Sequence, residues 1–340
     1  MISVLLALNM QSAWATPYGA VDEDGYPSWE DRDLHLWTNV VRVAPQDFES
    51  LYNNGGCSLS DFEDSETVPH APLYYDRNLN VAAVYHSQDM FDTGNFSHDS
   101  SDGTSFAERV ARFYSESGYV GENIAYGYGS GYNTVFTGWM CSSGHRANIM
   151  GDYNELGTGV IGDYMTQDFA AGTIDALSPI AMGLHEPAEP TDSVSFYVDW
   201  QDAAAPAELR VILNGKEVPL DLEWGRDTQG VFIGEASLTD APACSEYYVR
   251  WTTAAGATGT FPESGSYTFG DCDDLGWIEG QMCVLGINCA SAEELNEGIS
   301  LVGCTSAPGR VSGWASAGVG LALLAARRPR RGRDESRREG

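Results

Sequence analysis

The sequence predicts an α+β domain followed by an all-β sandwich. In the first half, apolar residues recur at intervals of three and four, as on one face of a helix, and two short strand segments follow. From about Leu177 the period of the apolar residues changes to two, which indicates β-strands. The chain has 340 residues, of which 43% are hydrophobic, so it is long and apolar enough to build two cores.

Two long helices are expected before residue 100. The first ends at Pro45 and presents apolar residues at helical spacing, namely Leu34, Trp37, Val40 and Val41. After a loop over 49–71, the second helix starts from Asp76, a good N-cap residue. Its apolar stripe comprises Leu79, Ala82, Ala83, His86 and Met90. His86 therefore faces inward, where a hydrogen-bonded core histidine is the more frequent role.

Two further helices and a hairpin complete the first domain. A capping box at 105–108 starts the third helix, which stops near Gly118. A fourth helix is predicted over 133–142. Alternating apolar residues over 157–169 predict two strands joined by the two-residue turn Gly162-Asp163. Helices followed by a small antiparallel sheet are typical of an α+β domain.

The second half reads as a series of short strands. Alternating apolar and polar residues mark 194–200, 209–213, 218–220, 231–238, 247–251 and 266–269. The turn Asn214-Gly215 connects two of these strands. Five or more short strands in under 100 residues predict a β-sandwich of the immunoglobulin-like kind, which a disulfide between Cys244 and Cys272 would brace.

Charge and cysteine content point to an acidic, exported protein. The net charge is −31, so the chain repels phosphate backbones and nucleic-acid binding is not expected. Residues 1–15 end in Ala-Trp-Ala and read as a secretory signal peptide, with a short buried strand as the alternative. The seven cysteines form no C-x-x-C pair and fit an oxidising compartment. The expected disulfides are Cys57–Cys141, Cys244–Cys272 and Cys283–Cys289, which leaves Cys304 without a partner.

The C-terminal region suggests membrane attachment. Residues 311–326 carry no charge and are followed by an arginine cluster at 327–333. As a helix, these 16 residues would reach roughly 24 Å, short of the about 30 Å hydrocarbon core, so the span is marginal. Arginines on its C-terminal side would remain in the cytoplasm and place the rest of the chain outside.

Three polar clusters in the first half could carry chemistry: NFSH, GENIAYG and SGHRANIM, which contain His98, Glu122 and His145. Each cluster is expected at a helix end or in a loop, where scaffolds present functional groups. Two imidazoles and a carboxylate could meet in one cleft and bind a divalent cation such as Zn²⁺. Spacing alone makes this a weak signal, because a local pair such as H-E-x-x-H is absent.

Six motifs in this region resemble those of bacterial CAP (SCP) domains, the superfamily of cysteine-rich secretory, antigen-5 and pathogenesis-related-1 proteins. In order, they are HSQDM, FSH, GENIAYG, GHRANIM, LGTGV and TQDF. The resemblance implies an α-β-α sandwich with a broad cleft, in which two histidines and two acidic residues can hold a zinc-like ion. His98 and Glu122 match the first histidine and carboxylate, and His145 matches the second histidine. Ser142 stands where eukaryotic members have a second glutamate, which removes one carboxylate.

The resemblance also gives the Ser143-Gly144 pair a role: the helix is expected to break there, so that His145 leaves it and points into the cleft. The stretch from Cys304 to the arginines resembles the MYXO-CTERM sorting tails of exported myxobacterial proteins, which implies surface attachment with or without cleavage. An ordinary single-span anchor is the alternative. The expected organisation is a signal peptide at 1–15, a CAP domain at 28–172, a β-sandwich at 177–272, a cysteine-containing linker at 273–304 and a membrane or sorting tail at 305–333.

Two functions are weighed for the His98, Glu122 and His145 cleft. The first is an extracellular binding module at the cell surface, whose ligand is a small molecule, lipid, glycan or other cell-wall component, or a divalent ion. The alternative is a zinc-dependent hydrolase of peptide or cell-wall bonds, in which the histidines hold the metal and Glu122 is the base. Purely structural roles stay open as well: hydrogen-bonded loop histidines, a Glu122–Arg146 ion pair, and Arg146 and Asn148 tying down loop carbonyls.

Overall fold

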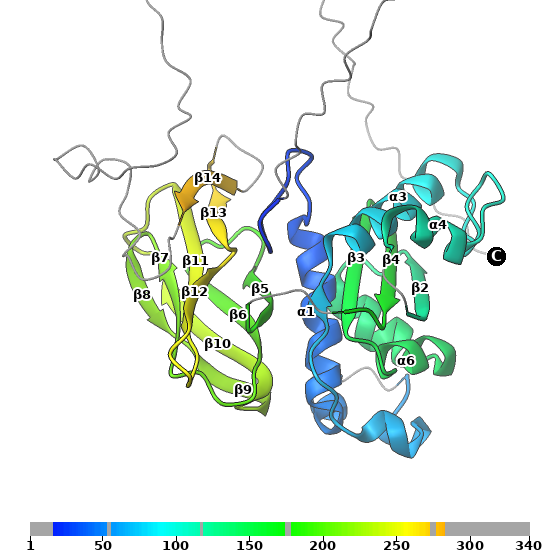
Figure 1. The fold of residues 1–340 in the computed structure, drawn as a ribbon, viewed down its shortest axis with the longest axis horizontal. Coiled ribbons are helices and arrows are strands. Elements are labelled where there is room, and N and C mark those ends of the chain that lie inside the picture. The colour runs from blue at the N-terminus through cyan, green and yellow to red at the C-terminus, as the bar shows by residue number, and fades with distance from the viewer. Residues whose placement is uncertain (1–15, 53–55, 116–117, 174–177, 273–276, 283–340) are drawn as a thin grey trace, which may run out of the picture. The chain divides into compact units, whose positions relative to one another are not determined.

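The computed structural model describes residues 16–52, 56–115, 118–173, 178–272 and 277–282 (Figure 1). The expected signal peptide, the Cys283–Cys289 pair, Cys304 and the C-terminal tail lie outside the described residues. In the part of the chain that the structure does describe, none of the helices combines the length and apolar composition needed to span a bilayer.

The first half is built on a four-stranded sheet in the order β1-β3-β4-β2. The strands are β1 (Tyr74–Tyr75), β2 (Val120–Tyr126), β3 (Glu155–Ile161) and β4 (Tyr164–Ala170). Strands β3 and β4 form the predicted hairpin around Gly162, whose φ of 59° suits a glycine. Strand β1 pairs in parallel with β3, whereas β2 runs antiparallel to β4. Strand β2 corrects the expectation that residues 121–127 form a loop or helix end.

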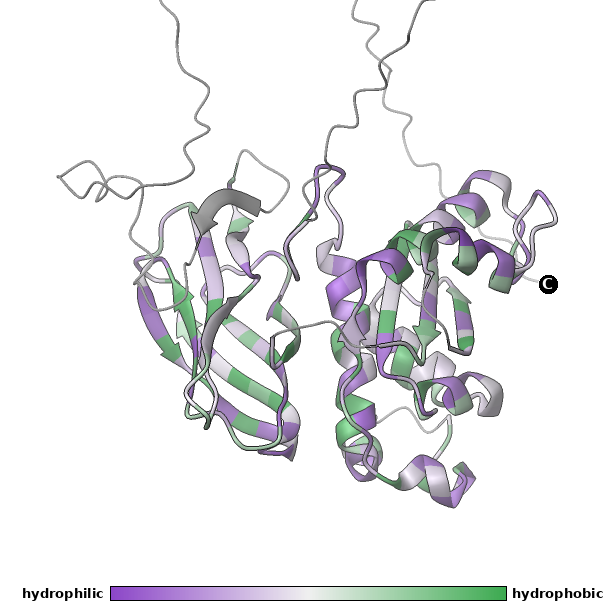
Figure 2. Cartoon of the chain, in the orientation of Figure 1, coloured by the Kyte–Doolittle hydropathy of each residue, from purple (hydrophilic) through white to green (hydrophobic). Residues whose placement is uncertain are grey.

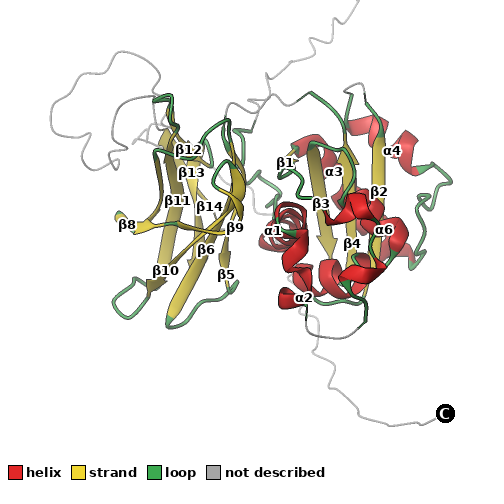
Figure 3. Ribbon diagram, turned by 90° about the horizontal axis from the view of Figure 1, so that it is seen from below, coloured by secondary structure: helices red, strands yellow, loops and turns green. Residues whose placement is uncertain are grey.

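Helices cover both faces of this sheet, as Figure 3 shows. Helix α3 (Arg77–Thr93) packs so closely on β3 that a Cβ added at Gly159 would lie 2.3 Å from backbone atoms of Ala83 and Val84. On the opposite side, Thr158 donates a hydrogen bond to the Asp31 carbonyl of helix α1 (Trp29–Val43) at 2.9 Å. Successive residues of a strand point to opposite faces, so the layers are α-β-α, as expected.

The remaining helices of the first half are short. They are η1 (Pro45–Asp47), α2 (Phe48–Leu51), η2 (Leu59–Asp61), η3 (Asp64–Thr67), α4 (Phe106–Phe113), α5 (Gly131–Asn133), the π-helix η4 (Thr134–Trp139) and α6 (Ser143–Ile149). The Asp76 N-cap and the Ser105 capping box are both present. Helix α4 ends at Phe113, earlier than predicted. The helix predicted over 133–142 is instead a wide π-turn that stops at Trp139.

The second half consists of two antiparallel sheets. One has the order β5-β6-β10-β9, and the other has the order β14-β13-β11-β7-β8, with β12 paired to β11. The strands are β5 (Ile180–Glu186), β6 (Ser193–Gln201), β7 (Glu208–Leu213), β8 (Lys216–Pro219), β9 (Asp221–Arg226), β10 (Gln229–Ser237), β11 (Cys244–Thr252), β12 (Thr258–Phe261), β13 (Ser264–Gly270) and β14 (Trp277–Met282). Hydrophobic and hydrophilic residues alternate along β6 and β11, for example (Figure 2). One buried cluster joins both sheets, with Phe196 and Trp200 from one and Val211, Tyr247 and Val249 from the other.

This arrangement agrees with a β-sandwich, and the immunoglobulin-like classification stays a prediction. Each strand predicted from alternation is present, whereas β5, β9, β12 and β14 were not predicted as separate strands. Strand β14 pairs with β13 and extends the sheet past Cys272, into the segment expected to be a linker. The expected disulfides Cys57–Cys141 and Cys244–Cys272 are present, with S–S distances of 2.06 Å and 2.07 Å.

Helix α1 packs against the second half as well as the first. It contacts strands β5, β6, β9 and β10, and its Asn39 Nδ2 donates to the buried Asp199 Oδ2 at 2.5 Å. Leu184 and Val231 of those strands belong to the same buried cluster as Leu34 and Val40 of α1. The two halves thus share part of one core, so experiments on this protein are best done on the full chain.

The neighbouring carboxyl groups of Asp33 and Glu186 at this contact predict a lower folding stability at alkaline pH. Burial, and then the charge of Asp33, raise the pKa of Glu186 to about 7, above its ordinary 4.5. Between these two values the unfolded chain has released a proton that the folded chain keeps, so stability falls as pH rises from about 4.5 to about 7. We expect Glu186→Gln to stabilise the protein at pH 8 by about 1–2 kcal/mol, discounted for partial exposure, and to change little at pH 4.

Thermal unfolding at both pH values checks this prediction. Glu189→Gln, an exposed carboxylate three residues away, is the matched control and should leave the melting temperature unchanged at either pH. An equal gain for Glu186→Gln at pH 4 and pH 8 would contradict the titration argument.

Candidate functional site

An open cleft of about 900 Å³ lies in the first half of the protein. Its walls come from the loop after α3, the end of β2, the π-helix, α6 and the start of β4. The lining residues are Gly94, Phe96, Ser97, His98, Asp99, Ile124, Ala125, Tyr126, Tyr128, Gly138, Trp139, Ser142, His145 and Tyr164. The cleft therefore contains both histidines selected from the sequence, together with five aromatic side chains.

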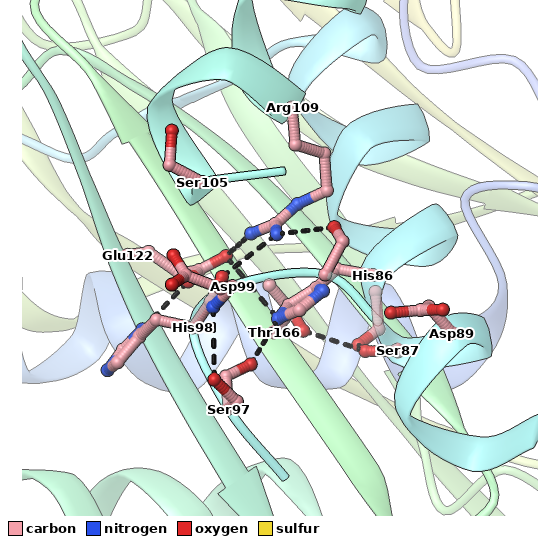
Figure 4. A network of polar contacts seen from close by, with 12 residues as sticks. His86, Ser87, Asp89, Ser97, His98, Asp99, Ser105, Arg109, Glu122 and Thr166 are labelled. Carbon is pink, nitrogen blue, oxygen red and sulfur yellow. Dashed lines mark hydrogen bonds and ion pairs between the residues drawn. The ribbon is translucent and has the colours of Figure 1, made fainter. Parts of the chain in front are cut away.

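His98 is held by a buried carboxylate. Its Nδ1 lies 2.7 Å from Oε1 of Glu122, which leaves the other ring nitrogen unoccupied by this contact (Figure 4). The side chain of His98 is 51% exposed, whereas that of Glu122 is 1% exposed. The hydrogen bond to Glu122 raises the pKa of His98 above its ordinary value, because a carboxylate favours the charged imidazolium. Glu122 thus orients His98 from the buried side of the ring and does not itself line the cleft.

Arg109 of helix α4 holds the other side of Glu122. Its buried guanidinium donates through Nη2 to Glu122 Oε2, and through Nη1 to the His98 carbonyl at 3.0 Å and Ser100 Oγ at 3.1 Å (Figure 4). One cation therefore fastens the His98 loop to strand β2. Both oxygens of Glu122 are engaged, one by His98 and one by Arg109.

A second buried carboxyl lies beside Glu122. Asp168 of β4 is the direct cross-strand partner of Glu122 and is fully buried. Neither of its oxygens accepts a hydrogen bond from a described donor. Burial, and then the charge of Glu122, raise the pKa of Asp168 well above its ordinary value. The protonated form of Asp168 is therefore favoured over the charged form, beside a glutamate that is already paired with Arg109.

His145 reaches the cleft from within helix α6. The helix starts at Ser143, with Ser142 as its N-cap residue, so His145 does not leave a helix as expected. The break lies between Trp139, where the π-helix ends, and Ser143. Burial, and then the charge of His98, lower the pKa of His145, which favours the neutral imidazole. The cleft thus presents two histidines whose pKa values are shifted in opposite directions.

Other polar residues singled out from the sequence have structural contacts. His86 is buried, and its Nε2 lies 2.9 Å from the Ser97 carbonyl oxygen, as a core histidine would. Arg146 pairs with Glu66 at 2.7 Å and donates to the Met140 carbonyl, so the alternative Glu122–Arg146 pair is wrong. Asn148 donates to the Glu122 carbonyl at 3.0 Å.

The donor set fits a catalytic zinc centre only in part. Nε2 of His98 and the imidazole of His145 are suitable ligand groups, and Glu122 would then support His98 from the outer shell. Catalytic zinc sites commonly use three protein ligands. Among the residues that the structure describes, no group of three or more His, Cys, Asp or Glu side chains is placed to hold a metal. A zinc-bound water activated by Glu122 therefore does not fit the residues present.

Sequence reasoning missed two members of this cluster, Arg109 and Asp168. Arg109 was read only as part of the third helix. Asp168 belongs to the TQDF motif, and the predicted hairpin already gave it a strand position. Because strands alternate, a carboxylate next to the apolar Phe169 could have been recognised as facing one of the two covered sides of the sheet.

The fold and cleft define an α-β-α domain with two histidines in an open groove. Residues 51–171 match the family model of CAP, described as the cysteine-rich secretory protein family. The uncharacterized membrane protein YlbC of Bacillus subtilis (strain 168) is 33% identical over 130 residues, which are 37% of each chain. The uncharacterized protein YkwD of the same organism is 36% identical over 135 residues, 39% of this chain and 51% of that one.

A solved structure is also similar in sequence. An extracellular protein containing a SCP domain from Bacillus anthracis str. Ames is 35% identical, with 29% of this chain and 33% of that chain covered and a TM-score of 0.27. The matches span between about a third and half of the length of these relatives. The match to the CAP family model thus lies in the first half of the chain and does not extend to the β-sandwich.

Proposed function

We propose that the protein is exported and binds an extracellular ligand in the cleft that contains His98 and His145. The observation that carries this proposal is that both side chains, 47 residues apart in sequence, line one open cleft of about 900 Å³. Pockets of this size that combine aromatic walls with a few polar groups are typical of ligand-binding sites. In this proposal His98 and His145 contact the ligand, and Glu122 positions His98.

Export is supported by several independent features. The two disulfides fit an oxidising compartment. The N-terminal apolar stretch fits a signal peptide, and the C-terminal sequence fits a membrane or sorting tail. The similar protein from Bacillus anthracis is described as extracellular. We therefore place the protein at the cell surface, attached through its tail or released from it.

Binding is favoured over hydrolysis by the contacts of Glu122. A general base must be free to accept a proton from its substrate or from water. Both oxygens of Glu122 are instead held, by His98 and by Arg109. The side chain also has only 1% of its surface exposed. Its position suits orientation of His98 better than direct proton abstraction.

The test is a titration of the full chain, followed by NMR of the imidazole resonances. The probes are an N-acetylglucosamine oligomer, a lysophospholipid and zinc chloride, one for each class of ligand considered. We expect at least one probe to shift the resonances of both His98 and His145, and His98→Ala and His145→Ala each to weaken its binding by about tenfold or more. His70→Ala, outside the cleft, is the control.

Two results would overturn the proposal. One is that no probe shifts either cleft histidine. The other is turnover of casein or peptidoglycan that requires Glu122, measured with Glu122→Gln, which would favour the hydrolase.

A further inference from the structure

Three aromatic side chains from different elements lie in contact, and two of them, Tyr126 and Tyr164, line the cleft. Phe91 lies near the end of α3, Tyr126 ends β2 and Tyr164 starts β4. The ring centroid of Tyr164 is 4.7 Å from that of Tyr126, with the planes at 45°, and 6.4 Å from that of Phe91, with the planes at 90°. We call these three residues the aromatic corner.

The fold holds the aromatic corner in place. Tyr126 and Tyr164 are direct partners in the pairing of β2 with β4. The hairpin glycine Gly162 lies against the ring of Phe91, and a Cβ added there would be 3.0 Å from it. Strand register and turn geometry therefore position the rings, which lowers the entropy cost of binding a ligand against their exposed surfaces.

Two of the three rings in the aromatic corner are exposed. Phe91 is 52% exposed and Tyr126 is 55% exposed, whereas Tyr164 is partly buried. Exposed apolar side chains that cluster, and do not occur singly, commonly mark a binding surface. Tyr126 and Tyr164 also line the cleft of the proposed function, so the corner is continuous with it.

Carboxylates are the charged groups nearest to the corner in sequence and in the cleft wall. Asp92 follows Phe91, Asp163 precedes Tyr164, and Asp99 lines the cleft. All three are exposed, and none takes part in an ion pair with another described residue. The cleft wall, as described, contains no lysine or arginine. Of the two histidines in this wall, His98 is already paired with Glu122, and burial lowers the pKa of His145, which disfavours its charged form.

These observations favour a cation over an anion or a hydrocarbon chain. The faces of aromatic rings attract cations, and quaternary ammonium groups are characteristic ligands of several rings placed together. A net charge of −31 attracts cations to the protein and repels anionic membrane surfaces. A hydrocarbon ligand would gain nothing from the negative potential of these carboxylates.

We propose that the aromatic corner binds a quaternary or alkylated ammonium group. The proposal rests on the proposed function, because it assigns a ligand class to one end of the same cleft. Tyr126, Tyr164 and Phe91 provide the exposed aromatic surface, while Asp99 and Asp163 supply the negative potential. The ammonium group can belong to a choline-type lipid headgroup or to a free small molecule.

The experiment compares choline with neohexanol, in which an uncharged carbon replaces the quaternary nitrogen. Each is titrated into the full chain, and NMR follows the resonances of the tyrosine rings. We expect choline to bind about tenfold more tightly than neohexanol, and its affinity to fall as salt is added. Vesicles of phosphatidylcholine and of phosphatidylglycerol then separate the two sources: binding to the first alone assigns a lipid headgroup, whereas binding of free choline alone assigns a small molecule.

Variants of Tyr126 test the aromatic corner itself. Tyr126→Leu keeps apolar bulk but removes the ring, so choline binding should weaken by about tenfold while neohexanol binding changes little. Tyr126→Trp should strengthen choline binding, because indole is the best cation partner among the aromatic side chains. Tyr85→Ala, an exposed ring on α3 that packs on Phe113 outside the cleft wall, is the control and should change neither.

Equal affinity for choline and neohexanol would overturn the proposal, as would the absence of any shift with choline or an unchanged choline affinity in Tyr126→Leu. If choline fails while the N-acetylglucosamine oligomer, lysophospholipid or zinc still shifts His98 and His145, the aromatic corner assignment is wrong and the proposed function stands. If no probe shifts those histidines, the proposed function fails independently.

Discussion

Replacing Arg109 by methionine should destabilise the folded protein by about 3–5 kcal/mol. The guanidinium is fully buried and is the cation that balances Glu122, so its removal leaves a buried carboxylate unpaired. The variant also loses the hydrogen bonds to the His98 carbonyl and Ser100, which fasten the loop to the sheet. Chemical denaturation of the full chain measures the effect, as a lower midpoint with a similar slope.

Two further variants make the Arg109 prediction specific. Arg112→Met removes an arginine three residues away whose side chain is 45% exposed and whose contact with Asp102 is 3.7 Å long; we expect a change within about 0.5 kcal/mol. Adding Glu122→Gln to Arg109→Met removes the unpaired charge and should recover a large part of the loss. If Arg109→Met costs no more than Arg112→Met, the buried ion pair is not important for stability.

Gly159→Ala should be similarly damaging, with a loss of about 3 kcal/mol or more. The added Cβ would lie 2.3 Å from the backbone carbonyl carbon of Ala83 and from the backbone nitrogen of Val84. Backbone atoms of a helix cannot change conformation independently as a flexible side chain can. Helix α3 must therefore move away from β3. The thermal unfolding midpoint and the yield of soluble protein report the effect.

The same substitution elsewhere serves as the control. At Gly144, in the first turn of α6, an added Cβ meets no atom within 4 Å. Alanine is favoured over glycine in helices, so Gly144→Ala should be neutral or stabilise by about 0.5–1 kcal/mol. A melting temperature for Gly159→Ala close to that of the wild-type protein would show that the α3 and β3 layers can separate at little cost.

The parts of the fold that were predicted correctly depend on signals within a few residues. Asp76 and Ser105 begin helices because their side chains accept hydrogen bonds from backbone N–H groups three positions later. The β3–β4 hairpin follows from a two-residue turn with a glycine at positive φ. Each signal acts before any distant part of the chain is in place, so periodicity and capping rules suffice to read it.

Strand β2 could not be predicted in this way. It begins Val-Gly-Glu-Asn, and glycine and asparagine are depleted in strands. Long-range contacts compensate: Asn123 donates to the His145 carbonyl and to Gln167, both more than 20 residues away. Local preference is overridden by hydrogen bonds that form only when the sheet and α6 come together.

Three residues of the candidate site were predicted from sequence, whereas the buried charged groups around Glu122 were not. His98, Glu122 and His145 were selected from sequence. The structure brings the two histidines to one cleft and places Glu122 on the buried side of His98. Arg109 and Asp168 show why the rest was missed. Both side chains become part of the site only because they are buried beside Glu122. Arg109 is 13 residues from Glu122 in sequence, and Asp168 is its partner on the neighbouring strand. Nothing in a local pattern reports which charges will be desolvated together.

The number of residues in the π-helix Thr134–Trp139 affects the shape of the cleft wall. Its closing hydrogen bond runs from the Met140 amide to the Val135 carbonyl, a wider turn than an α-helix makes. Trp139, which forms part of the wall, donates from this turn to the Ile124 carbonyl at 3.1 Å. Deleting one residue from the turn would restore ordinary α-helical pitch and rotate the indole away from that carbonyl. When homologous chains are aligned, a single-residue gap in this segment would therefore mark a differently shaped groove, even where every motif around it is retained.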